Sequence, residues 1–281
     1  MYIQKQKVTL SSLGSNGRFG NQIFQYAFLR IYAKYHNLDF ETPYWIGEYL
    51  FGHNDARISS DLPLVKEEEI FLSSEYNLAK ESNAFRNVDL YGYFLYYTKF
   101  YNHYKEFFLS LFQPQSNIIS QMQPSLDILK SQGKTIVGIH IRRGDFGKYP
   151  YYIAPSSWYR KYLDGLWQTL DNPVLFIASD EILKSVKDFS QYNPISCKDL
   201  DIKLAELDFY PDFYLLNQCD VLLISNSTFS FAASMLNERC KIFARPHFDF
   251  NKLIPFDPWN SQPFIYSNLA RPKLYNVFRW M

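Results

Sequence analysis

The second half of the chain alternates short apolar strands with helices, and this pattern restricts the fold more than any other feature. Apolar runs rich in β-branched residues occupy residues 135–141, 174–179, 221–225 and 241–244. Helical periodicity predicts helices over residues 156–170, 181–189, 204–218 (interrupted near Pro211) and 228–236. Strands that are apolar on both faces and separated by helices predict a parallel sheet covered on both sides. Ligands of such sheets bind beyond the carboxyl ends of the strands.

The first half is less regular. Residues 8–13 and 88–95 read as strands, and residues 21–36 have the apolar spacing of a helix. The stretch 41–85 is rich in loop residues, and its Pro and Gly residues are expected to interrupt regular secondary structure. The full length of 281 residues suits two small domains that share a cleft.

Composition excludes several classes of protein. With 47% hydrophobic residues and a net charge of +1, the chain is neither disordered nor suited to track a nucleic-acid backbone. No run approaches the ~18 apolar residues of a membrane span, and the first residues lack an apolar signal core, so we expect a cytoplasmic protein. The tail 271–281 mixes basic and apolar residues. It predicts either a final helix packed on the protein or a peripheral contact with the inner face of the membrane.

The three cysteines are few, odd in number and widely spaced. Cys197, Cys219 and Cys240 contain no Cys-x-x-Cys pair. This pattern is typical of free buried thiols and not of a disulfide framework or a zinc site.

The first polar constellation follows the strand 135–141. Alternation along the strand end puts His140 and Arg142 on one face and Arg143 on the other. The planar fork of an arginine suits phosphate oxygens, and a fixed guanidinium stabilises a departing phosphate without a metal. Asp145 would lock the arginine or take a proton from an acceptor hydroxyl. The alternative is a structural Arg–Asp pair at the strand end.

The second constellation follows the strand 221–225 and opens the next helix. Free backbone N–H groups and the positive end of a helix form an anion site, and side-chain hydroxyls add donors. An N-cap cluster without a ligand is the alternative. The residues of this turn are Ser225, Asn226, Ser227, Thr228, Phe229 and Ser230. Because it also follows a parallel strand, this turn should lie at the same sheet edge as the first constellation.

The third constellation is the glycine-rich segment 14–22, which contains Gly17, Arg18, Gly20 and Asn21. Its Gly-x-x-Gly-x-x-Gly spacing, with the bulky Arg18, differs from a dinucleotide-binding loop. We interpret it as a tight turn that presents Asn21 and Arg18 to a cleft, with a turn that binds nothing as the alternative.

The three segments together resemble the alpha-1,2-fucosyltransferases of glycosyltransferase family 11. The resemblance is carried by GRFGNQIFQYA (17–27), HIRRGDF (140–146) and SNSTFSFAASML (225–236), which occur in the family's order. It implies an α/β, GT-B-like fold of two Rossmann-like domains facing a cleft. We expect residues 1–130 on the acceptor side, residues 131–265 on the GDP-sugar side and a C-terminal helix over 266–281, packing back on the first domain.

The resemblance also implies a chemistry. L-fucose would pass from GDP-β-L-fucose to a hydroxyl of an oligosaccharide or glycolipid, with inversion, without a metal or other cofactor, and with an α-1,2 linkage. Arg142 or Arg143 would hold the β-phosphate, while His140, Asp145 and the 225–230 turn complete the donor site. Asn21 would approach from the other domain. Both Asp145 and His140 remain candidates for the base.

Other functions compete with this interpretation. A relative using another nucleotide sugar and a non-catalytic binding protein remain alternatives. A metal-dependent transferase would use Asp199 and Asp201, but this Asp-x-Asp pair follows no clear strand. A glycosidase would pair Asp145 with Asp180 and leave both arginines idle. A nucleophilic hydrolase would be indicated by a Gly-x-Ser-x-Gly motif, which this chain lacks.

Overall fold

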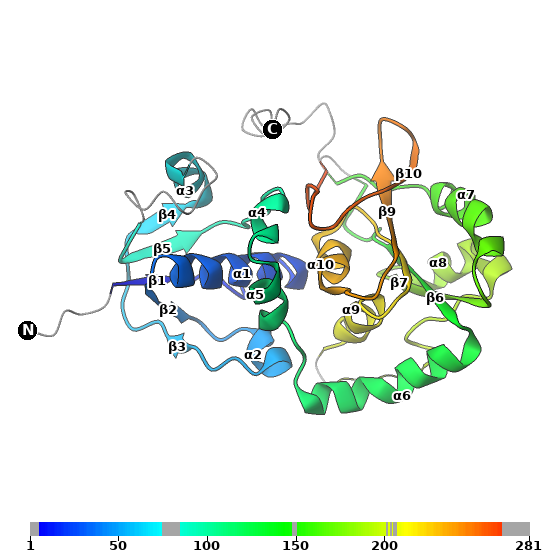
Figure 1. Ribbon diagram of the computed structural model, residues 1–281, viewed down its shortest axis with the longest axis horizontal. Coiled ribbons are helices and arrows are strands. Elements are labelled where there is room, and N and C mark those ends of the chain that lie inside the picture. The colour runs from blue at the N-terminus through cyan, green and yellow to red at the C-terminus, as the bar shows by residue number, and fades with distance from the viewer. Residues whose placement is uncertain are drawn as a thin grey trace, which may run out of the picture. The chain divides into compact units, whose positions relative to one another are not determined.

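The chain divides into two compact units, Met1–Ser116 and Asn117–Met281. The computed structural model describes residues 6–74, 85–147, 151–200, 202, 204 and 207–265. Residues 71–74 are described by their backbone alone. Each unit is built around its own five-stranded sheet (Figure 1). The division falls at the start of α6 (Ser116–Gln132), whereas the sequence suggested the end of that helix. The predicted helix over 266–281 lies outside the described residues.

The sheet of the first unit is entirely parallel, with strand order β3-β2-β1-β5-β4. Its strands are β1 (Lys7–Thr9), β2 (Asp39–Thr42), β3 (Ala56–Arg57), β4 (Leu64–Lys66) and β5 (Val88–Tyr91). Its helices are α1 (Phe19–Tyr35), α2 (Ile46–Phe51), α3 (Glu67–Ser74), α4 (Lys99–Asn102) and α5 (Lys105–Leu111). α1 packs on β1 and β2 and is buried along most of its length. Its Phe28 stacks on Phe94 with ring centroids 4.2 Å apart.

Several predictions for this unit are wrong in extent. The predicted strands 8–13 and 88–95 shorten to β1 and β5, and the stretch 41–85 contains β3, β4, α2 and α3. These elements have two to eight residues, which is too short for apolar periodicity to register. The predicted helix 21–36 is confirmed as α1, which begins two residues earlier.

The sheet of the second unit has strand order β10-β9-β8-β6-β7, and only β10 among its strands is antiparallel to its neighbour. Its strands are β6 (Thr135–Ile141), β7 (Pro173–Ser179), β8 (Val221–Leu223), β9 (Ile242–His247) and β10 (Lys252–Pro255). Beside α6, its α-helices are α7 (Ser156–Leu166), α8 (Ile182–Asp188), α9 (Tyr210–Leu216) and α10 (Thr228–Leu236). The short 3₁₀ turns are η2 (Trp167–Thr169) and η3 (Ser190–Tyr192).

Helices cover both faces of this sheet, as the apolar strands predicted. Ile139 and Ile141 of β6 belong to a buried cluster with Tyr159 and Leu163 of α7. The neighbouring His140 points to the other face, where its ring lies 5.2 Å from that of Phe229 in α10. Period-2 alternation along β6 therefore separates an α7 face from an α10 face.

The second unit differs from the prediction in several places, and its helix α6 was not predicted. No helix covers residues 204 and 207; α9 begins at Tyr210, with Pro211 in its first turn, where the missing N–H of proline costs no hydrogen bond. The strand predicted over 241–244 extends to His247 and pairs with β10, which apolar runs alone did not reveal.

The three cysteines are free, as predicted. Burial raises the pKa of all three thiols, that of Cys240 to about 12. In the described part of the chain, no helix combines the length and apolar character needed to cross a membrane.

Gly138 in the middle of β6 predicts a packing limit. A Cβ placed there would lie 2.5 Å from Cys219 Sγ, whereas a Cβ at Gly165 in α7 meets nothing within 4 Å. We expect Gly138→Ala to lower the free energy of unfolding by about 1–3 kcal/mol through overpacking. The matched control Gly165→Ala should raise it by up to about 1 kcal/mol, because Ala is the better helix former. Denaturant titration measures both, and equal midpoints would contradict this packing.

Candidate active site

The first and second constellations meet at the carboxyl edge of the second sheet. β6 ends at Ile141 and β8 ends at Leu223, and these strands are hydrogen-bonded neighbours. His140 Nδ1 lies 2.8 Å from Ser225 Oγ, which joins the two segments directly. The predicted meeting of the clusters at one sheet edge is therefore confirmed.

His140 is buried and neutral at physiological pH. Only 5% of the residue is exposed, and burial lowers its pKa to about 4 despite the opposing charge of Asp180. Its Nδ1 is engaged by Ser225, and Phe229 lies against its ring. This environment suits a positioning role, in which the imidazole orients the serine at the start of the turn.

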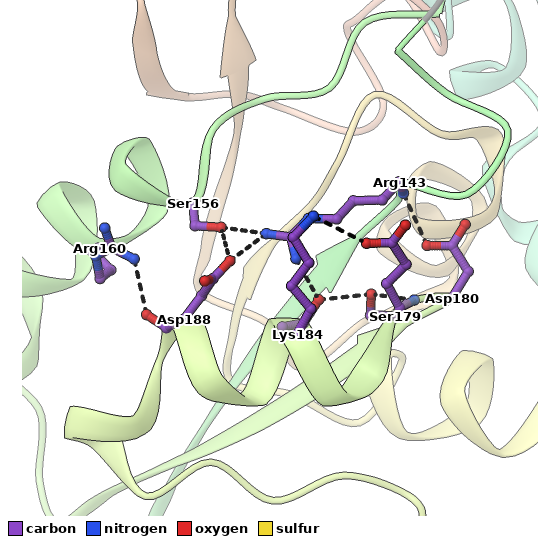
Figure 2. Close-up of polar contacts among 9 residues, drawn as sticks. Arg143, Ser156, Arg160, Ser179, Asp180, Lys184 and Asp188 are labelled. Carbon is purple, nitrogen blue, oxygen red and sulfur yellow. Dashed lines mark hydrogen bonds and ion pairs between the residues drawn. The ribbon is translucent and has the colours of Figure 1, made fainter.

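Arg143 lies on the α7 face and is held by the protein itself. It is 6% exposed, and its guanidinium donates to Ser156 at 2.5 Å and to Asp188 (Figure 2). The Ser185 Oγ lies 3.4 Å from Nη1 of the same guanidinium. Desolvation opposes the negative charge of Asp188, but hydrogen bonds from Ser156 and Arg143 outweigh it and hold the pKa of Asp188 below its usual range. Arg143 thus forms a structural Arg–Asp pair at the strand end, which was the alternative to a ligand-binding role, although its partner is Asp188 and not Asp145.

Arg142 lies at the sheet edge with a partly exposed guanidinium. Its side chain is 18% exposed and pairs with Asp145 and with Asp180, the latter at 3.0 Å. It also lies over the Phe146 ring, 5.5 Å from the centroid. Because Asp145 is 55% exposed, this pair borders solvent, unlike that of Arg143. Of the two arginines, Arg142 is the one that a ligand at this edge would meet.

Asp180 organises the turn after β6. Its Oδ1 accepts the backbone N–H of Arg143 at 2.9 Å, while its Oδ2 pairs with Arg142. A Cβ at Gly144 would lie 2.6 Å from that Oδ2, so only glycine fits there without a shift. From the sequence, Asp180 is expected only as a carboxylate of the alternative glycosidase. Its position directly after β7 was the signal for this role.

The second constellation forms the start of α10, as predicted. Ser227 is the N-cap residue, and its Oγ accepts the Phe229 N–H at 3.3 Å. The Asn226 side chain donates to the Ile265 carbonyl and accepts the Ile265 N–H, both at 2.8 Å. Asn226 therefore fixes the segment that follows β10. Ser230 is fully buried, and Thr228 is the first residue of α10.

The third constellation is a turn built by side chains that the sequence analysis did not single out. Gln22 donates to the carbonyls of Gly14 and Gly17, and Gln25 donates to those of Asn16 and Gly92. Their amides thereby fold the glycine-rich segment onto the first turns of α1. The signal for this role was the repeated Gln three residues apart on one helix face.

The residues predicted to present this turn lie where it meets α1. Gly17 has φ +84, and a Cβ there would lie 2.4 Å from Asn21 Nδ2. Arg18 is the exposed N-cap residue, and Gly20 and Asn21 lie in the first helical turn. The structure thus brings Gly17, Arg18, Gly20 and Asn21 together in the first unit.

The residues described here do not assemble a metal site. Among them, no three or more His, Cys, Asp or Glu side chains gather as metal ligands would. Asp199 instead accepts the backbone N–H and the hydroxyl of Ser196 in a turn. Asp201 lies outside the described residues. Independence from metal stays a prediction.

The buried His140 predicts a pH dependence of stability. Its pKa is about 4 in the folded protein against an ordinary 6.5, so the unfolded chain binds the extra proton between these values. Stability should therefore fall as pH drops from about 6.5 to 4, by at most about 3 kcal/mol from this group. We expect His140→Asn, which keeps a polar atom for Ser225, to show a smaller fall. Denaturant unfolding at a series of pH values measures it; equal slopes in both proteins would contradict it.

Comparison with known proteins supports the family suggested by the motifs. The sequence model of glycosyl transferase family 11 matches residues 2–245. No curated protein sequence matches the chain significantly.

Solved structures share the fold at low sequence identity. Fucosyltransferase NodZ from Bradyrhizobium superposes with a TM-score of 0.62 at 13% identity, covering 91% of this chain and 99% of NodZ. NodZ alpha-1,6-fucosyltransferase soaked with GDP-fucose gives 0.59 at 13% identity, covering 90% and 99%. A mutant of Arabidopsis thaliana FUT1 in complex with GDP gives 0.54 at 14% identity, covering 89% and 72%.

These matches confirm the α/β, GT-B-like fold class. The family match spans most of the chain and includes all three motif segments. The chain belongs to glycosyl transferase family 11 and is a glycosyltransferase.

Proposed function

We propose that this protein transfers L-fucose from GDP-β-L-fucose to a hydroxyl of an oligosaccharide or glycolipid, with inversion and without a metal. The observation that carries the proposal is the partly exposed Arg142 at the same sheet edge as the N-terminal turn of α10. A guanidinium and a helix N-terminus at one sheet edge form a site for a diphosphate. Among the structures named above, NodZ alpha-1,6-fucosyltransferase was soaked with GDP-fucose, and the FUT1 mutant is in complex with GDP. This supports the same donor here.

The proposed linkage is α-1,2. It rests on the three sequence motifs and their order alone. The NodZ relative gives it no support, because NodZ is an alpha-1,6-fucosyltransferase. A donor carrying another sugar is the remaining alternative, because a site for the diphosphate recognises the nucleotide and not the sugar.

In the proposed mechanism an acceptor hydroxyl attacks the anomeric carbon directly and GDP departs. The bond from that carbon to the β-phosphate oxygen breaks, and its electron pair stays on GDP. Arg142 stabilises this negative charge from a fixed position, which is the largest single contribution that such sites make. The turn from Ser225 to Ser230 adds backbone donors.

The two candidate bases differ in exposure. Asp145 is 55% exposed, whereas His140 is 5% exposed and its Nδ1 is occupied by Ser225. We therefore assign Asp145 the proton from the acceptor hydroxyl, which requires it to release Arg142 to the phosphate. Asn21 would approach the donor from the first unit. Arg143 acts as a positioning residue that anchors the turn carrying Arg142.

The different surroundings of the two arginines predict different phenotypes. Arg142→Ala should lower kcat by about 100- to 1000-fold, the loss of one preorganised donor, with an unchanged Tm. Arg143→Ala should destabilise the protein by about 3 kcal/mol, the low end for a broken buried pair, since the Asp188 side chain is 29% exposed. Steady-state kinetics and thermal unfolding measure both.

The exposed Lys184→Ala is the control and should change neither quantity. If Arg142→Ala retained normal turnover, the proposed phosphate role of this residue would be lost.

The donor is tested directly with purified protein. We expect GDP to raise Tm more than UDP, CMP or NAD, and GDP-fucose to be hydrolysed or transferred faster than GDP-mannose. Activity should persist in EDTA, because Arg142 and the α10 turn carry the charge of the leaving group. Preferential stabilisation by UDP would overturn the choice of donor, and abolition by EDTA would overturn metal independence.

A further inference from the structure

Arg245 occupies the same face of the second sheet as His140. β8 pairs with β9 so that Leu223 lies opposite Ala244, and Leu223 in turn lies opposite Ile139. Ala244 and Ile139 both belong to the cluster on the α7 face. Alternation along β9 therefore turns Arg245, like His140, toward α10.

The Arg245 guanidinium is buried with one edge unused. The residue is 4% exposed, and Nη1 donates to the Gln262 carbonyl at 2.6 Å. Nε and Nη2 are buried and have no hydrogen-bond partner. These two nitrogens form one edge of the planar fork, the edge that matches two oxygens of a phosphate or carboxylate.

Nothing in the described chain neutralises this charge. Among residues 6–74, 85–147, 151–200 and 207–265, no carboxylate pairs with Arg245, and burial alone lowers its pKa to about 9. The group thus remains protonated at neutral pH. A buried cation without an anion is costly, so its retention indicates a partner that arrives from outside.

Aromatic rings hold the guanidinium in place. Its central carbon lies 5.3 Å from the ring centroids of both Phe231 in α10 and Phe256 after β10. Such contacts orient the plane of the fork without consuming its hydrogen-bond donors. The unused edge is therefore oriented before any ligand binds.

The surroundings of Arg245 are shared with the α10 turn. Phe231, which contacts the guanidinium, lies in the first turns of α10. The segment that accepts from Arg245 at Gln262 is the one fixed by Asn226 at Ile265. Arg245 and the N-terminal end of α10 thus belong to one connected group at the sheet edge.

We infer that Arg245 binds a phosphate group of the donor through Nε and Nη2, alongside the N-terminal turn of α10. The inference rests on the proposed function for the identity of the donor. It adds a second arginine, from β9, to the one that β6 supplies. Arg142 and Arg245 would then approach the diphosphate from two strands of the same sheet.

The test measures binding of inorganic pyrophosphate, GDP and guanosine by calorimetry. Arg245→Met keeps an unbranched side chain against the two rings but removes the charge. We expect at least tenfold weaker binding of pyrophosphate and GDP, unchanged binding of guanosine, and an unliganded Tm equal to or above that of the wild type. Arg239→Met is the control, because Arg239 is an arginine paired with Asp220, and it should bind all three as the wild type does.

Binding of pyrophosphate and GDP by Arg245→Met within twofold of the wild type would overturn the inference. A lower unliganded Tm with unchanged pyrophosphate affinity would also overturn it, since that result describes a structural residue. If Arg245→Met does not fold, Arg245→Lys decides, because it keeps the charge but loses the two-pronged edge. We expect it to bind pyrophosphate several-fold more weakly, and unchanged affinity would refute the role.

These measurements separate the inference from the proposed donor. A wild type that binds pyrophosphate through Arg245 but prefers UDP to GDP would sink the donor assignment and support the role of Arg245. If the wild type prefers GDP and Arg245→Met binds pyrophosphate and GDP as tightly as the wild type does, the donor assignment is supported and the role of Arg245 is refuted.

Discussion

The turn that carries the candidate site depends on the carboxylate of Asp180. One of its oxygens accepts the Arg143 N–H and the other pairs with Arg142. The same side chain leaves room only for glycine at position 144. Because Asp180 follows β7 and the turn follows β6, adjacent strands fix each other's ends. The direction of each guanidinium follows from this arrangement.

Two adjacent arginines consequently meet different environments. Arg143 turns into the layer between the sheet and helices α7 and α8, where Asp188 and Ser156 satisfy it. Arg142 stays at the edge, with partners that border solvent. One dipeptide thus supplies a charge held by the fold and a partly exposed charge at the sheet edge. In the proposed mechanism, the buried arginine keeps the position of the exposed one reproducible, which electrostatic catalysis requires.

The sequence predicted β6, β7 and α10 closely, because long apolar runs and an N-cap serine leave few alternatives. It did not predict the small elements of the first unit or the antiparallel β10, whose pairing depends on tertiary contacts. For the site, it identified the chemical types but not which arginine is buried. That distinction depends on Asp188, which is 45 residues from Arg143 and visible only once β6 and α8 are packed.

The raised pKa values of Cys197, Cys219 and Cys240 have a practical consequence. Maleimide reagents attack the thiolate, so protonated and largely buried thiols react slowly. A cysteine introduced at an exposed position, such as Tyr44→Cys in the first unit or Lys184→Cys in the second, would be modified well before the native ones. The chain therefore accepts a pair of fluorescent dyes without removal of its own cysteines, and energy transfer between them would report on the separation of the two units during turnover.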